Sequence, residues 1–197
     1  MVSASVVAGL IGPVPELHIL NETIRNVYFH VPMWFSMVIL YLISVIYSIK
    51  YLNSGDMKHE KMNVEALNVG IVFCGFGLLT GMLWANITWG EPWPNDPKLN
   101  GSAIATLMYL AYLVLRNALE EDQKRAKISA VYNIFAFPIM VVLLYILPKL
   151  TDSLHPGSGG NSTFGELDMD NYMRPVFYTA VVGWILTGVW VCTIRYR

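Results

Sequence analysis

Charged residues are scarce in this chain. Only 14% of its 197 residues are Asp, Glu, Lys or Arg, whereas a soluble domain of this size carries roughly 25%. The apolar share is 55% and the mean hydropathy is +0.47. This imbalance argues against a soluble domain and favours a protein embedded in a membrane.

A basic excess and a cysteine framework are also missing. The 13 Lys and Arg face 14 Asp and Glu, for a net charge of −1, so a nucleic-acid partner is not indicated. The two cysteines, Cys74 and Cys192, lie far apart within apolar runs. Their spacing fits neither a disulfide framework nor a metal site, and we interpret both as packing residues.

Long uncharged runs take up much of the chain. About 20 apolar residues cross a bilayer as a helix, and five runs meet that length, while a shorter sixth opens the chain. We predict an all-α integral membrane protein, a single domain of six transmembrane helices whose first helix starts raggedly. The approximate spans are residues 2–14, 30–50, 66–88, 100–117, 128–148 and 175–194.

The distribution of basic residues predicts the orientation, because Lys and Arg concentrate on the cytoplasmic side of a membrane protein. Nine of the thirteen fall on the side of both termini, which we therefore expect to be cytoplasmic. The nine are Lys50, Lys58, Lys61, Arg116, Lys124, Arg125, Lys127, Arg195 and Arg197. Three loops, residues 13–29, 89–100 and 149–174, then face outward.

One outward loop is unusual for so apolar a chain. Its sequence WGEPWPND, residues 89–96, contains Trp89 and Trp93, and three prolines fall within residues 92–97. Prolines exclude a regular helix and stiffen the backbone, while indole rings offer flat apolar surface with one polar group. The loop is therefore a rigid aromatic platform, or else a connector with an ordinary aromatic belt at the membrane boundary.

Two histidines emerge on the same outward side. His30 opens the second span, with Pro32 suited to a helix's first turn, and His155 follows the fifth span. Neutral imidazole is a good ligand for haem iron, which takes one ligand on each face. The residue types are those of a haem site, with outward cations for the anionic propionates: Arg25, Lys98, Lys149 and Arg174. Each histidine taken alone could equally be an interfacial polar residue.

The stretch WANITWGEPWPNDPKLNG resembles the tryptophan-rich WWD segment of haem-handling membrane proteins in cytochrome c maturation. Within that family, the chain is similar to the haem exporter protein C type. The pattern, approximately WGxxWxWD followed by a basic residue and Leu, is matched by Trp89, Gly90, Trp93, Asp96 and Leu99. NETIRNVYFHVPMWF and LHP at residues 154–156 resemble that family's two histidine segments.

The resemblance implies that His30 and His155 ligate the iron of haem b. It also implies that an outward segment, residues 84–100, shapes the porphyrin site, with cofactor contacts from Trp84, Trp89, Gly90, Trp93, Asp96, Lys98 and Arg25. The implied setting is the bacterial inner membrane, and the implied partners are a periplasmic haem chaperone, ABC-transporter subunits and membrane lipid. Three positions depart from the pattern: Asn95 replaces a tryptophan, Pro92 an aromatic residue, and Lys98 an arginine. A lysine is a point charge and makes a weaker propionate clamp than arginine.

We therefore expect a protein that presents haem on the periplasmic face for cytochrome c maturation. We expect no enzyme, because the chain lacks a Walker loop, an HExxH helix and a Ser/His/Asp set. Two other functions stay open: a cytochrome b-like haem subunit of a membrane oxidoreductase, and a haem-free permease or assembly anchor.

Overall fold

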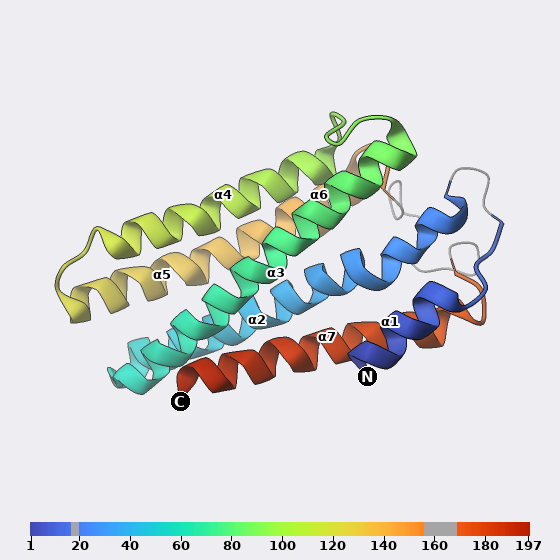
Figure 1. The fold of residues 1–197 in the computed structure, drawn as a ribbon. Coiled ribbons are helices and arrows are strands. Elements are labelled where there is room, and N and C mark those ends of the chain that lie inside the picture. The colour runs from blue at the N-terminus through green and yellow to red at the C-terminus, as the bar shows by residue number, and fades with distance from the viewer. Residues whose placement is uncertain (17–19, 156–168) are drawn as a thin grey trace.

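A computed structural model describes residues 1–16, 20–155 and 169–197, and the elements of this part of the chain are helices (Figure 1). In chain order these are α1 (Val2–Ile11), η1 (Asn21–Asn26), α2 (Val27–Ser54), α3 (Met57–Trp89), α4 (Pro97–Asn117), α5 (Asp122–Val141), η2 (Val142–Ile146), α6 (Leu147–Leu150) and α7 (Met173–Tyr196).

Five helical stretches are long and apolar enough to cross a membrane. They are Asn21–Ser54, Met57–Trp89, Pro97–Asn117, Asp122–Leu150 and Met173–Tyr196. The expected first crossing differs, because α1 has only 10 residues. Such a helix is about 15 Å long, half the roughly 30 Å of a bilayer's hydrocarbon core. The all-helical membrane fold is confirmed, and the prediction of six crossings is not.

Local signals place the helix ends. α2 ends at Gly55 and α3 at Gly90, both with positive φ (68° and 85°), the left-handed conformation that glycine adopts at no steric cost. The side chains of Asp56 and Asp96 accept hydrogen bonds from the first backbone N–H groups of α3 and α4, as N-caps do. These caps explain turns of only a few residues.

Two prolines lie in helix interiors. Pro32 is the sixth residue of α2 instead of standing in its first turn, because helical structure already begins at Asn21. Pro138 lies in α5, one turn before the π-helical segment η2. Each removes one backbone donor from its helical ladder.

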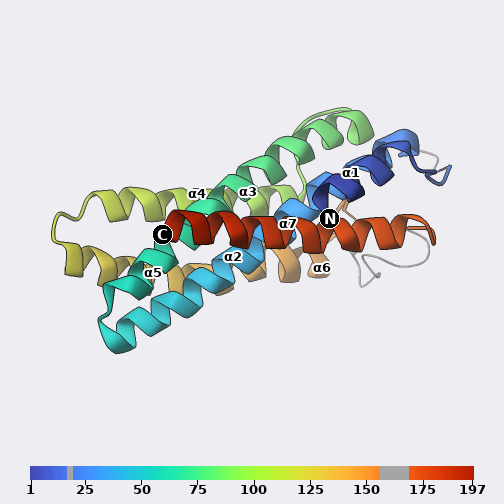
Figure 2. The ribbon, with the colours of Figure 1, turned by 60° about the horizontal axis from the view of Figure 1, so that its bottom comes forward.

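The helices run roughly along one axis, and both ribbon views show it (Figures 1 and 2). α2 packs against α3, α5 and α7, α4 packs against α5, and α1 lies along α7. The start of α2, the end of α3 and the start of α4 share one end of the bundle, which we call the histidine end. The turns at 54–57 and 117–122 and the C-terminus lie at the opposite end.

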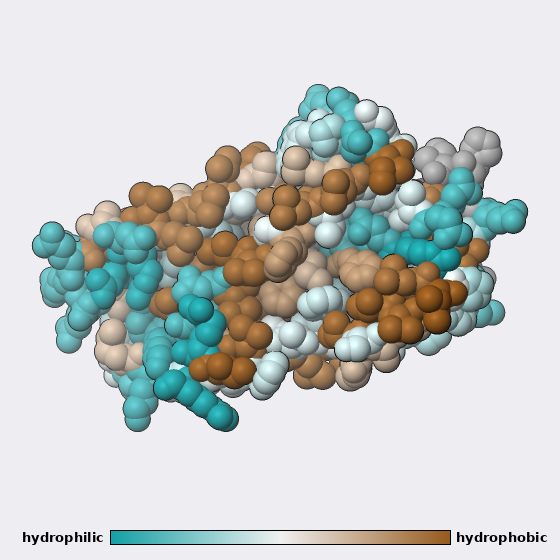
Figure 3. All heavy atoms as spheres, in the orientation of Figure 1, coloured by the Kyte–Doolittle hydropathy of each residue, from teal (hydrophilic) through white to brown (hydrophobic). Residues whose placement is uncertain are grey.

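The N-terminus lies elsewhere, against Gly183 near the middle of α7. The expectation that both termini share the cytoplasmic side therefore stays a prediction. Hydrophobic side chains cover the middle of the face in Figure 3, and hydrophilic side chains gather at both ends, as the lipid and water boundaries of a membrane protein require.

We predict that Gly101→Ala destabilises the bundle. A Cβ there would lie 2.6 Å from the backbone oxygen of Leu143 in η2, so helix backbones must move apart, at about 1–3 kcal/mol. Gly75→Ala is the matched control, since nothing lies within 4 Å of its Cβ position. Thermal unfolding in detergent, followed by circular dichroism, compares the two, and equal midpoints would contradict the close approach.

Candidate functional site

The structure brings both predicted histidines to the histidine end. His30 is the fourth residue of α2, and His155 follows α6 by five residues. The two imidazoles are near enough to interact electrostatically, and both also sense the charge of Lys98. Residues 125 positions apart in sequence therefore face a common site.

Helix α3 holds the ring of His30. Its Nδ1 lies 3.0 Å from the carbonyl oxygen of Gly77 and 3.2 Å from the hydroxyl oxygen of Thr80. A carbonyl only accepts hydrogen bonds, and the Thr80 hydroxyl donates to Phe76, so Nδ1 carries the proton. The lone pair on Nε2 is then available to a metal.

The glycines of α3 make room for this contact. A Cβ at Gly81 would lie 2.7 Å from Cε1 of His30, and a Cβ at Gly77 would lie 2.9 Å from the indole of Trp34. Trp34 and Trp84 meet the imidazole edge-on, with ring centroids 6.3 and 5.9 Å away. Gly77 and Gly81, which form a GxxxG spacing, thus leave room for an indole and an imidazole between α2 and α3.

Asp96 holds the ring of His155. One carboxylate oxygen lies 3.2 Å from Nδ1 of His155, whose imidazole also meets Trp89 at a centroid distance of 5.0 Å. A carboxylate is an acceptor, so Nδ1 donates and Nε2 again keeps its lone pair. Both histidines are therefore fixed in the tautomer that can bind iron through Nε2.

The Asp96 carboxylate is almost fully buried, with 1% of the side chain exposed. Besides His155 it accepts hydrogen bonds from two backbone N–H groups of α4, at 2.9 and 3.2 Å. It also accepts from the Ser153 hydroxyl at 2.8 Å and the Leu154 N–H at 2.7 Å. One side chain therefore joins the start of α4 to the segment after α6.

Protonation of this pair follows from burial and hydrogen bonding. Burial alone raises the pKa of the Asp96 carboxyl, but the hydrogen bonds that the carboxylate accepts outweigh burial and hold the pKa below its usual range. Burial lowers the pKa of the His155 imidazole despite the neighbouring carboxylate. At neutral pH the pair is a charged carboxylate and a neutral imidazole.

The predicted tryptophan segment is mostly helical. Trp84 and Trp89 belong to α3, and only residues 90–96 form a loop, which begins at Gly90. The indole N–H of Trp93 lies 3.3 Å from the side-chain oxygen of Asn100. The three indoles therefore lie in different places. Trp84 lies beside His30, Trp89 lies beside His155, and Trp93 lies on the partly exposed loop.

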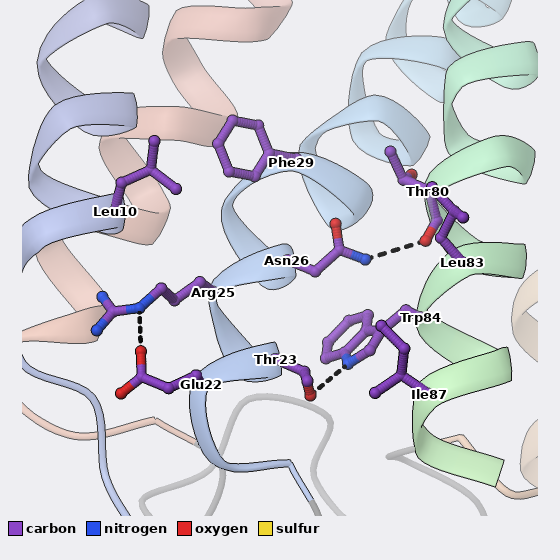
Figure 4. Close-up of a pocket in the computed structure, with 10 residues that line it drawn as sticks. All are labelled: Leu10, Glu22, Thr23, Arg25, Asn26, Phe29, Thr80, Leu83, Trp84 and Ile87. Carbon is purple, nitrogen blue, oxygen red and sulfur yellow. Dashed lines mark hydrogen bonds and ion pairs between the residues drawn. The ribbon is translucent and has the colours of Figure 1, made fainter. Parts of the chain in front are cut away.

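Arg25 takes a different place from the other candidates. Its guanidinium donates to the carbonyl oxygens of Gly9 and Gly12 at 2.9 and 2.7 Å and pairs with Glu22. It binds the end of α1, beside an open groove between α1, the start of α2 and the end of α3 (Figure 4). Trp84 lines that groove too, and its indole N–H points to the Thr23 hydroxyl.

Sequence reasoning missed three supporting residues. Thr80 and Trp34 surround His30, and Ser153 helps hold Asp96. Trp34 lies one turn after His30, a helical spacing that could have indicated the contact. Pro156, in the predicted LHP motif, lies outside the described residues.

Comparisons with known proteins identify the family of this chain. A family model described as Cytochrome C assembly protein matches residues 3–155, a region that contains both histidines and the tryptophan segment. The chain belongs to the cytochrome C assembly protein family. The resemblance inferred from the tryptophan segment is thereby confirmed.

Relatives in this family have similar names. Heme exporter protein C of Paracoccus denitrificans is 26% identical over 93% of this chain and 76% of the relative. Heme exporter protein C of Rhodobacter capsulatus is 25% identical over 90% of this chain and 73% of the relative. Cytochrome c biogenesis protein CcsA of Prochlorococcus marinus is 32% identical over 44% of this chain and 26% of the relative. Family membership and these relatives support a role in cytochrome c maturation for a multi-pass membrane protein.

We predict that Asp96→Asn destabilises the protein, by about 1–3 kcal/mol at pH 7, because an amide cannot accept from all of these donors. A carboxyl with a lowered folded pKa stabilises above its unfolded pKa of about 4 and loses that contribution as pH falls towards the folded value. The difference from the unsubstituted protein should therefore be complete above about pH 4 and shrink below it.

Thermal unfolding across pH measures this difference. Asp56→Asn is the control, because Asp56 is exposed and its side chain caps α3 through a single N–H group, a role that asparagine fills equally well. Equal loss in both variants would show that Asp96 acts only as a helix cap.

Proposed function

We propose that this chain binds haem b at the histidine end and delivers it for cytochrome c maturation. The observation that carries the proposal is that His30 and His155 lie near enough to interact electrostatically, with Nδ1 of each ring held by an acceptor. Two imidazoles with free Nε2 lone pairs suit haem iron, whose other four ligands come from the porphyrin. Here haem is the cargo, and we propose no catalytic role.

The surroundings fit a flat, apolar and anionic cargo. Trp84 and Trp89 place indole rings against the two imidazoles, and Trp93 and Gly90 belong to the loop beside them. Lys98 lies within electrostatic reach of both histidines and would meet a propionate. Asp96 positions His155 and would not touch the porphyrin, and Arg25, bound to the end of α1, would serve the propionates less directly.

Orientation and partners are part of the proposal. The opposite end carries most of the basic residues, because nine of the thirteen flank the turns at 54–57 and 117–122 or lie near the C-terminus. The positive-inside rule then puts the opposite end in the cytoplasm and the histidine end on the periplasmic face of a bacterial inner membrane. From there haem would pass to a periplasmic haem chaperone, with ABC-transporter subunits of the same system as partners.

Visible spectroscopy of the detergent-purified protein tests the haem site. We expect a Soret band that is lost in His30→Ala and in His155→Ala, and retained in His59→Ala, whose imidazole bonds to Ser54 at the opposite end. A colourless protein that does not bind added haem would favour a permease or assembly anchor without haem. A band unaffected by both substitutions would place haem elsewhere, and redox cycling by quinol would favour an oxidoreductase subunit.

Trp93→Ala should release haem faster without loss of helix content, since the indole lies on the loop and its one hydrogen bond is to Asn100. Loss of a stacking indole costs about 1 kcal/mol, or a few-fold in affinity. Haem transfer to apomyoglobin measures release, and circular dichroism measures helix content. The matched control is Trp190→Ala, since Trp190 on α7 is 64% exposed; a helix loss specific to Trp93→Ala would make that residue structural.

A further inference from the structure

Far from the histidines, a cluster of buried polar side chains lies between α2, α3 and α5, toward the opposite end. We call it the inner polar cluster, and its members are Ser44, Ser48, Glu60, Asn63, Ser129 and Asn133, each at most 2% exposed. Asn133 lies six residues past Lys127, the last charged residue of α5, which is about 9 Å along that helix. The cluster therefore reaches about a third of the way across a 30 Å hydrocarbon core.

A carboxylate sets the direction of the hydrogen bonds. Glu60 pairs with Arg116 of α4, so the buried charge is neutralised. Asn63 lies beside it, with its side-chain nitrogen 3.1 Å from the second carboxylate oxygen. Because a carboxylate accepts, the amide nitrogen of Asn63 must face Glu60, and its oxygen must face the other way.

The orientation of the Asn63 amide in turn fixes the orientation of the Asn133 amide. The Asn63 oxygen accepts from the Ser44 hydroxyl at 2.6 Å and lies 3.3 Å from the side-chain nitrogen of Asn133. That nitrogen also reaches the hydroxyls of Ser44 and Ser48, at 2.7 and 3.1 Å. If the Asn133 amide were flipped, its oxygen would face the side-chain oxygen of Asn63, and two acceptors would meet without a proton between them. Its own oxygen therefore points away from the network, and no donor among the described residues meets it.

One further group of the cluster shares this deficit. The hydroxyl of Ser129, one turn before Asn133 on α5, has no hydrogen-bond partner within the described chain. The hydroxyl of Tyr112 on α4 borders the cluster and lies within reach of the side chains of Asn63 and Arg116. An unsatisfied buried polar group costs about 1–3 kcal/mol. Buried groups of this kind are ordinarily satisfied by internal water.

We propose that the inner polar cluster is a water-binding site, which opens toward the opposite end beside the partly exposed Arg116 and has the Asn133 oxygen and the Ser129 hydroxyl as its ligands. Water suits it better than an ion, because Glu60 and Arg116 cancel one another and the free groups are neutral.

In the alternative case the cluster holds no water, and its polar groups only form hydrogen bonds between helices. Thiol chemistry separates the two cases, because only a thiolate reacts with a methanethiosulfonate and an apolar environment suppresses the thiolate. We choose Ser129→Cys and Ser44→Cys, which change one atom, in a Cys192→Ala background. A small charged reagent is supplied on both sides of proteoliposomes, and modification is followed by mass spectrometry.

The matched control is Ala136→Cys, buried on α5 one turn closer to the histidine end than Asn133. Native Cys74, which is buried in α3 near Tyr41, is an internal reference. We expect Ser129→Cys to react at least about tenfold faster than Ala136→Cys, the effect of one pKa unit on the thiolate population. Equal rates at the two positions would overturn the proposal.

Radiolytic hydroxyl-radical labelling of the unsubstituted protein gives an independent test, because radicals formed from bound water modify the nearest side chains. We expect label on Tyr112, beside Asn63, and none on Phe177, although both are at most 1% exposed. Unlabelled Tyr112 would mean a dry cluster. Both tests are independent of haem, so their failure would leave the proposed function unaffected.

Discussion

The buried carboxylate of Asp96 is the constraint on which the candidate site depends. The segment after α6 is not helical, so the helix lattice alone does not position His155. Asp96 caps α4, binds the backbone and hydroxyl of that segment, and orients the imidazole. Such a carboxylate is stable when buried because several donors compensate the lost hydration. The same hydrogen bonds that shape the loop thereby place a nitrogen lone pair at the site.

His30 reaches the site in a different way. Its position follows from two long helices packed closely through the small residues of α3, and the Gly77 carbonyl fixes its tautomer. One imidazole is thus held by the rigid frame, and the other by a single side chain that bridges three segments. In the proposed delivery of haem, the His155 side is the one that can open without disturbing the packing of α2 on α3.

The interior changes character along the bundle. Toward the histidine end lie Met37, Phe73, Met140 and the paired rings of Tyr41 and Tyr109, while the opposite half holds the inner polar cluster around the Glu60–Arg116 pair. Polar groups buried in a membrane protein must be satisfied internally. The rings of the stacked tyrosines belong to the apolar core of the bundle.

The sequence by itself determined the helical membrane fold and the candidacy of His30, His155 and the tryptophans, because long apolar runs, prolines and residue chemistry are local signals. It did not show that Glu60 pairs inside the bundle with Arg116, 56 residues away. Nor did it show that Arg25, expected near the propionates, binds the end of α1. Only the tertiary structure decided these partners, along with the imidazole seat at Gly81 and the bond from Asp96 to His155. Such contacts depend on the packing of helices distant in sequence, and no local pattern encodes that packing.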